Sequence, residues 1–113
     1  MINLEITVWP KNTKYREFSQ TLEQIKGDLK KHCIRLTIVD KENGFLITAD
    51  LKSKKQLSTI INSKEISILS GAIKMLCKVS KAVINGDGFK NKTYNLKEIQ
   101  LNSYRIIQKK HEN

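Results

Sequence analysis

Few side chains in this sequence could perform acid–base chemistry. The chain contains two histidines, two cysteines, three tyrosines and one tryptophan. Four polar or aromatic residues stand near the ends of the first expected strand and the first expected helix: Asn3, Trp9, Tyr15 and His32. Groups of these types could donate or accept a proton, or position a bound molecule by hydrogen bonds and ring contacts. They are therefore the candidate catalytic residues.

Each candidate also has a structural role, which we favour because one isolated polar residue shows no mechanism. Asn3 can be a polar group at a strand edge, and Trp9 can anchor a dimer interface. Tyr15 can be the first core residue of its helix, and His32 can be a cation at the C-terminus of that helix. The sequence thus indicates candidate residues but does not predict that they lie together in one site.

The cysteines do not form a cluster typical of a metal site. Cys33 and Cys77 are too few for structural zinc, and we expect both to be small buried apolar residues in a reducing compartment. A reactive thiol is the alternative, but it would require exposure and a lowered pKa. We predict no metal and no cofactor.

The chain is basic, since 21 Lys and Arg against 11 Asp and Glu give a formal net charge of +10 over 113 residues. Such a charge favours nucleic acid or an anionic membrane as a binding partner. The lysines are spread along the chain, however, and residues 43–47 match an RNA-binding strand signature at Gly44 and Phe45 only. We rank a nucleic-acid-binding module third among the functions and expect no membrane association.

The length fits one domain. Met1 leads directly into a strand pattern, without the basic start and apolar block of a secretory signal, and no apolar run is long enough to span a bilayer. We therefore expect a cytoplasmic protein.

Hydrophobic spacing predicts the elements that must position the candidates. Alternation over residues 2–9 predicts a half-buried strand that Pro10 ends. Apolar residues three or four apart then predict a helix over residues 15–29, with Asn12 or Thr13 as its N-cap. Residues 34–39 and 45–51 alternate on either side of a turn at Asn43-Gly44, which predicts a hairpin.

A second helical region follows the hairpin. Ser53 and Gln56 have the spacing of a capping box, and Asn62-Ser63 is expected to kink or divide the helical region that extends to Cys77. Within this region Gly71 suggests that another backbone or a ligand approaches closely, because glycine costs about 1 kcal/mol relative to alanine in a helix interior. Residues 81–84 predict the last strand, which a turn closes.

The order βαββαβ predicts an α+β, ferredoxin-like domain over residues 1–88, with an antiparallel four-stranded sheet and two helices on one face. The other face carries a mixed surface that is better paired than left in water, so we expect a homodimer through the sheet: Asn3, Thr7, Trp9, Arg35, Val39, Leu46 and Val83. We expect residues 89–113 to be a C-terminal extension, packed on the same domain or on the partner subunit. Its apolar residues fit neither period well, so it could be a short strand plus a helix or an arm that crosses to a partner, and we favour an ordered, partly helical extension with a frayed end after Gln108.

With these elements placed, the chain resembles the antibiotic biosynthesis monooxygenase family. Glu17-Phe18 in the first helix, Cys33 before the second strand and Lys52-Ser53 after the third occupy the places of family motifs in the right order. The most specific part is the stretch Leu69–Cys77, within SKEISILSGAIKMLC. The resemblance covers roughly the first three quarters of the chain.

The resemblance implies a dimeric α+β barrel, in which the sheets of two subunits face each other and each subunit has a cavity between sheet and helices. It also implies a cofactor-independent monooxygenase of small aromatic or quinol-like molecules. A small apolar or aromatic ligand would then lie among these cavity-lining candidates: Phe18, Leu22, Phe45, Leu51, Leu69, Gly71 and Ile73.

Three departures from the family pattern bear on function. Lys31-His32-Cys33 replaces a Pro-Gly-Cys turn, and Leu51 stands where many members have tryptophan. Ile60 stands where the haem-degrading branch would carry its axial histidine, so we do not expect haem degradation. Leu51 and the lack of an acid–base pair keep open the alternative of a non-catalytic dimeric small-ligand-binding or accessory protein of the same fold.

Overall fold

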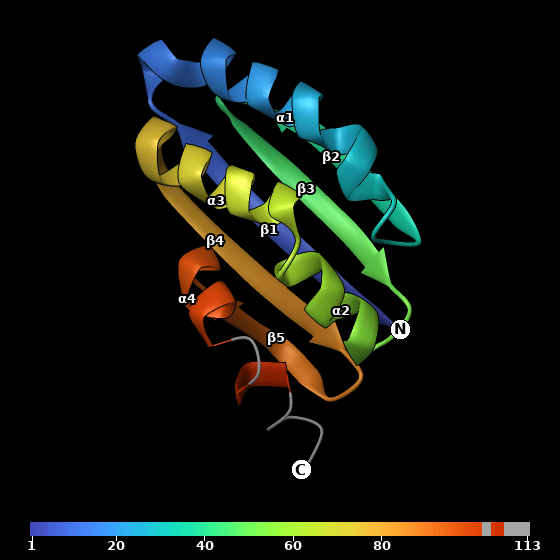
Figure 1. Cartoon of the computed structure of the whole chain (residues 1–113). Helices are drawn as coiled ribbons and strands as arrows, with labels where there is room; N and C mark the ends of the chain where they lie inside the picture. The colour runs from blue at the N-terminus through green and yellow to red at the C-terminus, as the bar shows by residue number, and fades with distance from the viewer. Residues whose placement is uncertain (103–104, 108–113) are drawn as a thin grey trace.

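The computed structural model describes residues 1–102 and 105–107. A five-stranded antiparallel sheet has the order β2-β3-β1-β4-β5, and the helices cover one of its faces (Figure 1). The strands are β1 (Ile2–Pro10), β2 (Arg35–Lys41), β3 (Gly44–Leu51), β4 (Cys77–Gly86) and β5 (Phe89–Tyr94). The helices are α1 (Tyr15–Lys30), α2 (Lys54–Ile61), α3 (Lys64–Leu76) and α4 (Leu96–Leu101), with a 3₁₀ turn at Asn12–Lys14.

The central strand β1 shows the predicted alternation. Ile2, Leu4, Ile6 and Val8 are at most 2% exposed and face the helices, while the residues between them are partly exposed on the other face. Because β1 pairs with both β3 and β4, its apolar face lies in the middle of the core. The alternation with a period of two therefore predicted correctly which face of β1 is buried.

The first helix has the predicted apolar stripe, but its predicted N-cap is wrong. Phe18, Leu22, Ile25 and Leu29 of α1 are buried against the sheet. The N-cap is Lys14, whose side chain makes no capping hydrogen bond. Residues 12–14 already form a 3₁₀ turn that leads directly into α1, so neither Asn12 nor Thr13 occupies the cap position.

The division of the second helical region is confirmed. The Ser53 hydroxyl accepts a hydrogen bond from the Gln56 N–H at 3.3 Å and begins α2. The Ser63 hydroxyl accepts from the Ile66 N–H at 3.2 Å and begins α3. Each segment thus has its own N-cap, which explains why the chain forms two helices here instead of one.

The predicted four-stranded sheet with two helices is wrong, because the structure has a fifth strand and a short helix beyond it. The strand β5 returns antiparallel to β4 after a turn in which Gly86, Asp87 and Gly88 have positive φ values of 97°, 46° and 94°. Only the end residues of β5, Phe89 and Tyr94, are buried, so its sequence carries no alternation that would reveal a strand. The predicted end after Gln108 lies outside the described residues.

The other face of the sheet has no helix over it in the described part of the chain (Figure 1). Across its middle, Val39 is opposite Leu46, Leu46 is opposite Thr7, and Thr7 is opposite Lys81. The residues predicted for this face are all partly or fully exposed. We call this surface the open face. Among the described helices, none is long and apolar enough to cross a membrane.

Candidate ligand-binding site

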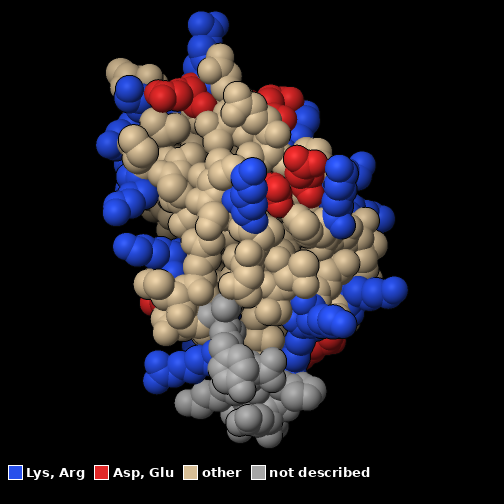
Figure 2. All heavy atoms as spheres, viewed as in Figure 1, with Lys and Arg blue, Asp and Glu red and all other residues tan. Residues whose placement is uncertain are grey.

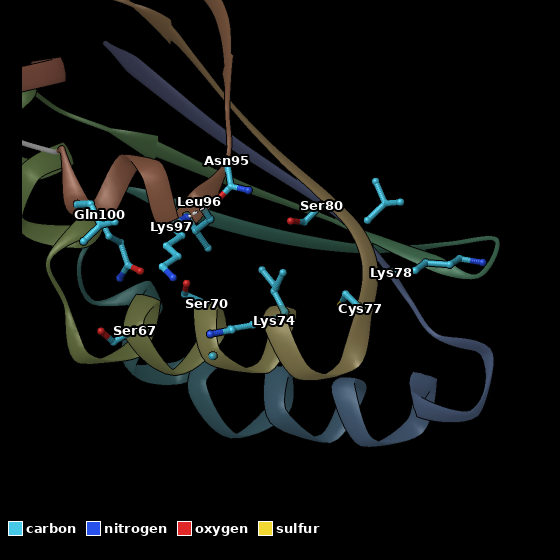
Figure 3. Close-up of a pocket in the computed structure, with 14 residues that line it drawn as sticks. Ser67, Ser70, Lys74, Cys77, Lys78, Ser80, Asn95, Leu96, Lys97 and Gln100 are labelled. Carbon is cyan, nitrogen blue, oxygen red and sulfur yellow. Dashed lines mark hydrogen bonds between the residues drawn. The ribbon is translucent and has the colours of Figure 1, made fainter.

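A pocket of about 490 Å³ lies between α3, α4 and the first residues of β4 (Figure 3). Cys77, Lys78, Val79 and Ser80 of β4 line it between the two helices. Ser80 is opposite Val8 in the sheet register, which places Ser80 on the helix-covered face. A pocket of this volume is large enough for a small organic molecule.

Helical spacing explains the wall that α3 contributes. Ile66, Leu69, Ile73 and Leu76 bury one side of α3 in the core. The pocket is lined from the adjoining side by Ser67, by Ser70 and Gly71 three and four residues later, and by Lys74 one turn beyond them. One helix thus supplies core residues and pocket residues from neighbouring stripes.

The opposite wall comes from α4 and the residue before it. Asn95 caps this helix, since its side-chain oxygen accepts a hydrogen bond from the Lys97 N–H at 2.9 Å. Leu96 and Ile99 are at most 3% exposed and hold α4 in place. Lys97, Gln100 and Leu101 then follow at helical spacing along the pocket.

The lining of the pocket is positively charged. Among the described residues it includes Lys74, Lys78 and Lys97 and no Asp, Glu or His. Figure 3 shows the side chains of Lys74 and Lys97 reaching toward Ser70 from the two helices. These groups could attract an anion or stabilise a hydroxyl that has lost its proton, whereas the lining holds no conventional general base.

The thiol in this pocket is not activated. Burial raises the pKa of Cys77 to about 11, although the charge of Lys11 acts in the opposite direction. Cys77 is therefore a neutral thiol near pH 7. Burial also raises the pKa of Cys33, with a smaller contribution from the charge of Asp50, and both cysteines are free.

None of the four predicted catalytic residues lines this pocket. Asn3 and Trp9 lie on the open face, where the Asn3 amide donates a hydrogen bond to the Asp50 carboxylate at 2.9 Å. They are six residues apart along one strand, or about 20 Å. The structure thus places these two far from each other and outside the pocket between α3 and α4.

Tyr15 and His32 belong to the helix-covered side and have separate partners. The Tyr15 hydroxyl donates a hydrogen bond to the Asp40 carboxylate, and its ring stacks on Phe45 with ring centres 5.0 Å apart. Mainly because of that hydrogen bond, the pKa of Tyr15 is raised to about 12. His32 Nε2 lies 2.7 Å from Glu65 Oε1.

The cavity-lining candidates divide into three groups. Gly71 and Ile73 line the pocket between α3 and α4. Leu22 and Phe45 border a smaller hollow of about 210 Å³ beside Asp40. The remaining three are fully buried in the core: Phe18, Leu51 and Leu69.

Sequence reasoning did not identify the polar residues on the α4 side of the pocket. The available signal was Asn95 as a capping residue in front of Leu96 and Ile99, which are three residues apart. Only six residues follow that signal in α4, so the periodicity is weak. The position of this helix depends on β5, and a short strand followed by a helix was only one of the alternatives that the sequence left open for this segment.

Several solved structures have the same fold. A protein from Deinococcus radiodurans, named as a candidate antibiotic biosynthesis monooxygenase, has a TM-score of 0.70 and 16% identity, covering 84% of this chain and 100% of its own. A protein from Nitrosomonas europaea with the same kind of name has a TM-score of 0.69 and 14% identity, covering 76% of this chain and 97% of its own. An uncharacterised NIPSNAP domain protein from Burkholderia xenovorans has a TM-score of 0.56 and 12% identity. That alignment covers 76% of this chain and 93% of the Burkholderia protein.

No protein-family model and no curated protein sequence matches the chain. The structural alignments cover nearly all of the three neighbours and leave part of this chain without a counterpart. At these identities the likeness concerns the fold. The chain therefore has the α+β fold of proteins named as antibiotic biosynthesis monooxygenases.

Proposed function

We propose that the protein is a cofactor-independent monooxygenase of small aromatic or quinol-like molecules. The observation that carries this proposal is its fold, since several solved structures with this fold are named for antibiotic biosynthesis monooxygenases. The pocket between α3 and α4 is the site that we assign to the substrate. Its apolar lining includes Ile73 and Leu96, and its cations include Lys74 and Lys97 from the two helices.

The chemistry requires that the substrate supply every electron. In the simplest balanced reaction, a ring CH₂ group becomes C=O, one oxygen atom of O₂ is incorporated, and the other leaves as water. Ionisation of a neighbouring hydroxyl makes the ring more electron-rich and so more reactive toward O₂. The ammonium groups of Lys74 and Lys97 would stabilise that oxyanion and thereby lower the pKa of the bound hydroxyl.

Oxygen uptake tests this proposal. The purified protein, treated with a chelator and free of flavin absorbance, is mixed with menadiol in an oxygen electrode. In this assay the quinol gives two electrons and two protons to O₂, forming quinone and hydrogen peroxide. We expect uptake faster than in buffer and in heat-denatured protein. Equal rates in all three samples would contradict catalysis of quinol oxidation.

A non-catalytic small-ligand-binding or accessory protein is the second function. The observation that favours it is the lining of the pocket, which over residues 1–102 and 105–107 has cations and hydroxyls but no His, Asp or Glu. Tight binding of an aromatic ligand without oxygen uptake would support this function over the monooxygenase.

Nucleic-acid binding remains the third function. In the view of Figure 2, the Lys and Arg side chains are spread around the surface and do not form one continuous patch. Phe45 and Tyr94 are buried, so these strand aromatics are not available on the open face for stacking on bases. Absent or salt-insensitive retention on single-stranded RNA would exclude this function.

We also propose that two copies pair through their open faces. The support is the partly exposed mixed surface around Leu46, Thr7 and Val39, which the described helices leave uncovered. A stable interface commonly buries about 800 Å² on each partner, which is an area that one face of a small sheet can provide.

A further inference from the structure

The pocket between α3 and α4 brings two lysines together from separate parts of the chain. Lys74 lies in the last turn of α3, and Lys97 lies in the first turn of α4. Both line the same pocket, and Figure 3 shows their side chains converging near Ser70. This arrangement exists only because β5 returns along β4 and places α4 opposite α3.

These two lysines differ from several others in the chain. Lys14, Lys26 and Lys31 of the α1 region each have an ion pair with a carboxylate three residues away. Within the part of the chain that the structure describes, Lys74 and Lys97 have no ion pair. Because no Asp or Glu is among the described lining residues, no described carboxylate in the lining balances their charge. An anion bound between them would reduce their mutual repulsion.

The rest of the lining indicates what kind of anion fits. Ser67, Ser70 and Gln100 can donate hydrogen bonds, while Ile73 and Leu96 provide apolar surface. A fully hydrated inorganic ion would leave that apolar surface unused. A molecule with an apolar ring and one acidic group would use both parts of the lining.

We propose that this pocket binds a small aromatic anion, with its carboxylate between Lys74 and Lys97 and its ring against Ile73 and Leu96. The inference rests on the proposed function in taking this pocket as the substrate site, and it adds the class of molecule. It also assigns a role to α4, which completes the site by supplying Lys97.

The test compares two probes of the same shape, 2-naphthoate and 2-naphthamide, by isothermal titration calorimetry at fixed ionic strength. We expect the charged probe to bind the full chain about tenfold more tightly than the neutral probe. Amide shifts in a ¹⁵N–¹H correlation spectrum should lie on α3, α4 and the start of β4. Equal affinities, or shifts confined to other elements, would overturn the proposal.

Two double variants separate a local effect from a general loss of charge. K74Q/K97Q removes the two helix lysines proposed to hold the carboxylate, leaves Lys78 of β4 in place, and should abolish the preference for 2-naphthoate. K90Q/K92Q removes the same charge from exposed residues of β5 outside the pocket lining and should keep that preference. If both variants lost it equally, the selectivity would come from net charge and the proposed site would be wrong. Circular dichroism and urea denaturation check that each variant is folded.

The binding test and the oxygen-uptake test can fail independently. Neither naphthalene probe is a quinol, so their binding requires no turnover. Selective binding of 2-naphthoate together with no menadiol oxidation would keep the anion site and favour the binding function. If the protein oxidised menadiol but bound both naphthalene probes equally, the proposed catalysis would stand and the proposed anion site would be wrong.

Discussion

His32 Nε2 lies 2.7 Å from Glu65 Oε1, which connects the chain just after α1 to the first turn of α3. The side chains are 30% and 16% exposed, so water screens this pair less than it screens the surface ion pairs. The two helices lie side by side over the sheet (Figure 1). His32, a candidate for catalysis from the sequence, thus has a structural partner in the fold.

Replacing Glu65 with glutamine should destabilise the protein. E65Q weakens the contact with His32 and removes a negative charge from the N-terminal turn of α3, where the helix dipole favours one. We expect a loss of about 0.5–1 kcal/mol in the free energy of unfolding, measured by urea denaturation at neutral pH.

E17Q is the matched control, because Glu17 also lies in the first turn of a helix, but its contact with Lys14 is 3.6 Å long and exposed. E17Q should lower the free energy of unfolding by less than E65Q does. A double-mutant cycle with H32Q isolates the pair itself. A coupling energy of zero would show that the contact does not contribute to stability.

Gly71 should tolerate alanine. A Cβ atom built at Gly71 has no atom of the described residues within 4 Å, so the predicted close approach of another backbone is not seen in that part of the chain and the position lies beside the pocket. G71A should therefore stabilise the protein by about 0.5–1 kcal/mol through helix propensity. Thermal and urea denaturation measure the change.

Two other glycines serve as comparisons. Gly27 in α1 also has open space around its Cβ position, so G27A should give a similar gain. Gly86 has a φ of +97° and a Cβ position only 2.1 Å from the Met1 carbonyl oxygen. G86A should cost about 2 kcal/mol or more. A loss of stability in G71A alongside a gain in G27A would show that Gly71 has a packing constraint.

The Tyr15–Asp40 hydrogen bond should make stability depend on alkaline pH. The pKa of Tyr15 is raised from 10.0 to about 12, mainly because its hydroxyl donates to Asp40, with added effects of burial and of the Asp40 charge. Between these values the unfolded chain loses the Tyr15 proton while the folded chain keeps it, so stability falls as pH rises.

D40N should move the pKa of Tyr15 back toward its ordinary value and make this decline shallower. Ultraviolet absorbance of tyrosinate follows the ionisation, and urea denaturation at several pH values follows the stability. D28N removes an equal charge from α1, where Asp28 pairs with Lys31, and should leave the Tyr15 titration unchanged. If Tyr15 titrated at the same pH in the wild type and in D40N, the hydrogen bond to Asp40 would not be the cause of its raised pKa.

The proposed dimer predicts different effects for two apolar-to-lysine substitutions. L46K places a charge in the middle of the open face and should convert a dimer to a monomer, as measured by size exclusion with light scattering. M75K makes the same change on α3, at a side chain that is 72% exposed, and should remain a dimer. A monomeric wild-type protein would contradict pairing through the sheet.

Local patterns predicted much of the fold. The alternation of β1, the apolar stripe of α1, the cap at Ser53 and the break at Asn62-Ser63 each appear in the structure. These features depend on residues close in sequence, because strand and helix periods decide which side chains share a face. The fold class followed from their order.

The sequence by itself determined the first four strands, their buried face and the helices α1 to α3, since their burial patterns repeat along the chain. The tertiary structure decided the rest: the polar strand β5 is ordered by pairing with β4, and α4 is thereby placed opposite α3. It also separated Asn3 and Trp9 from Tyr15, and it brought Lys74 and Lys97 to one pocket. Periodicity specifies which face of an element is buried, but the proximity of side chains distant in sequence depends on how the elements pack.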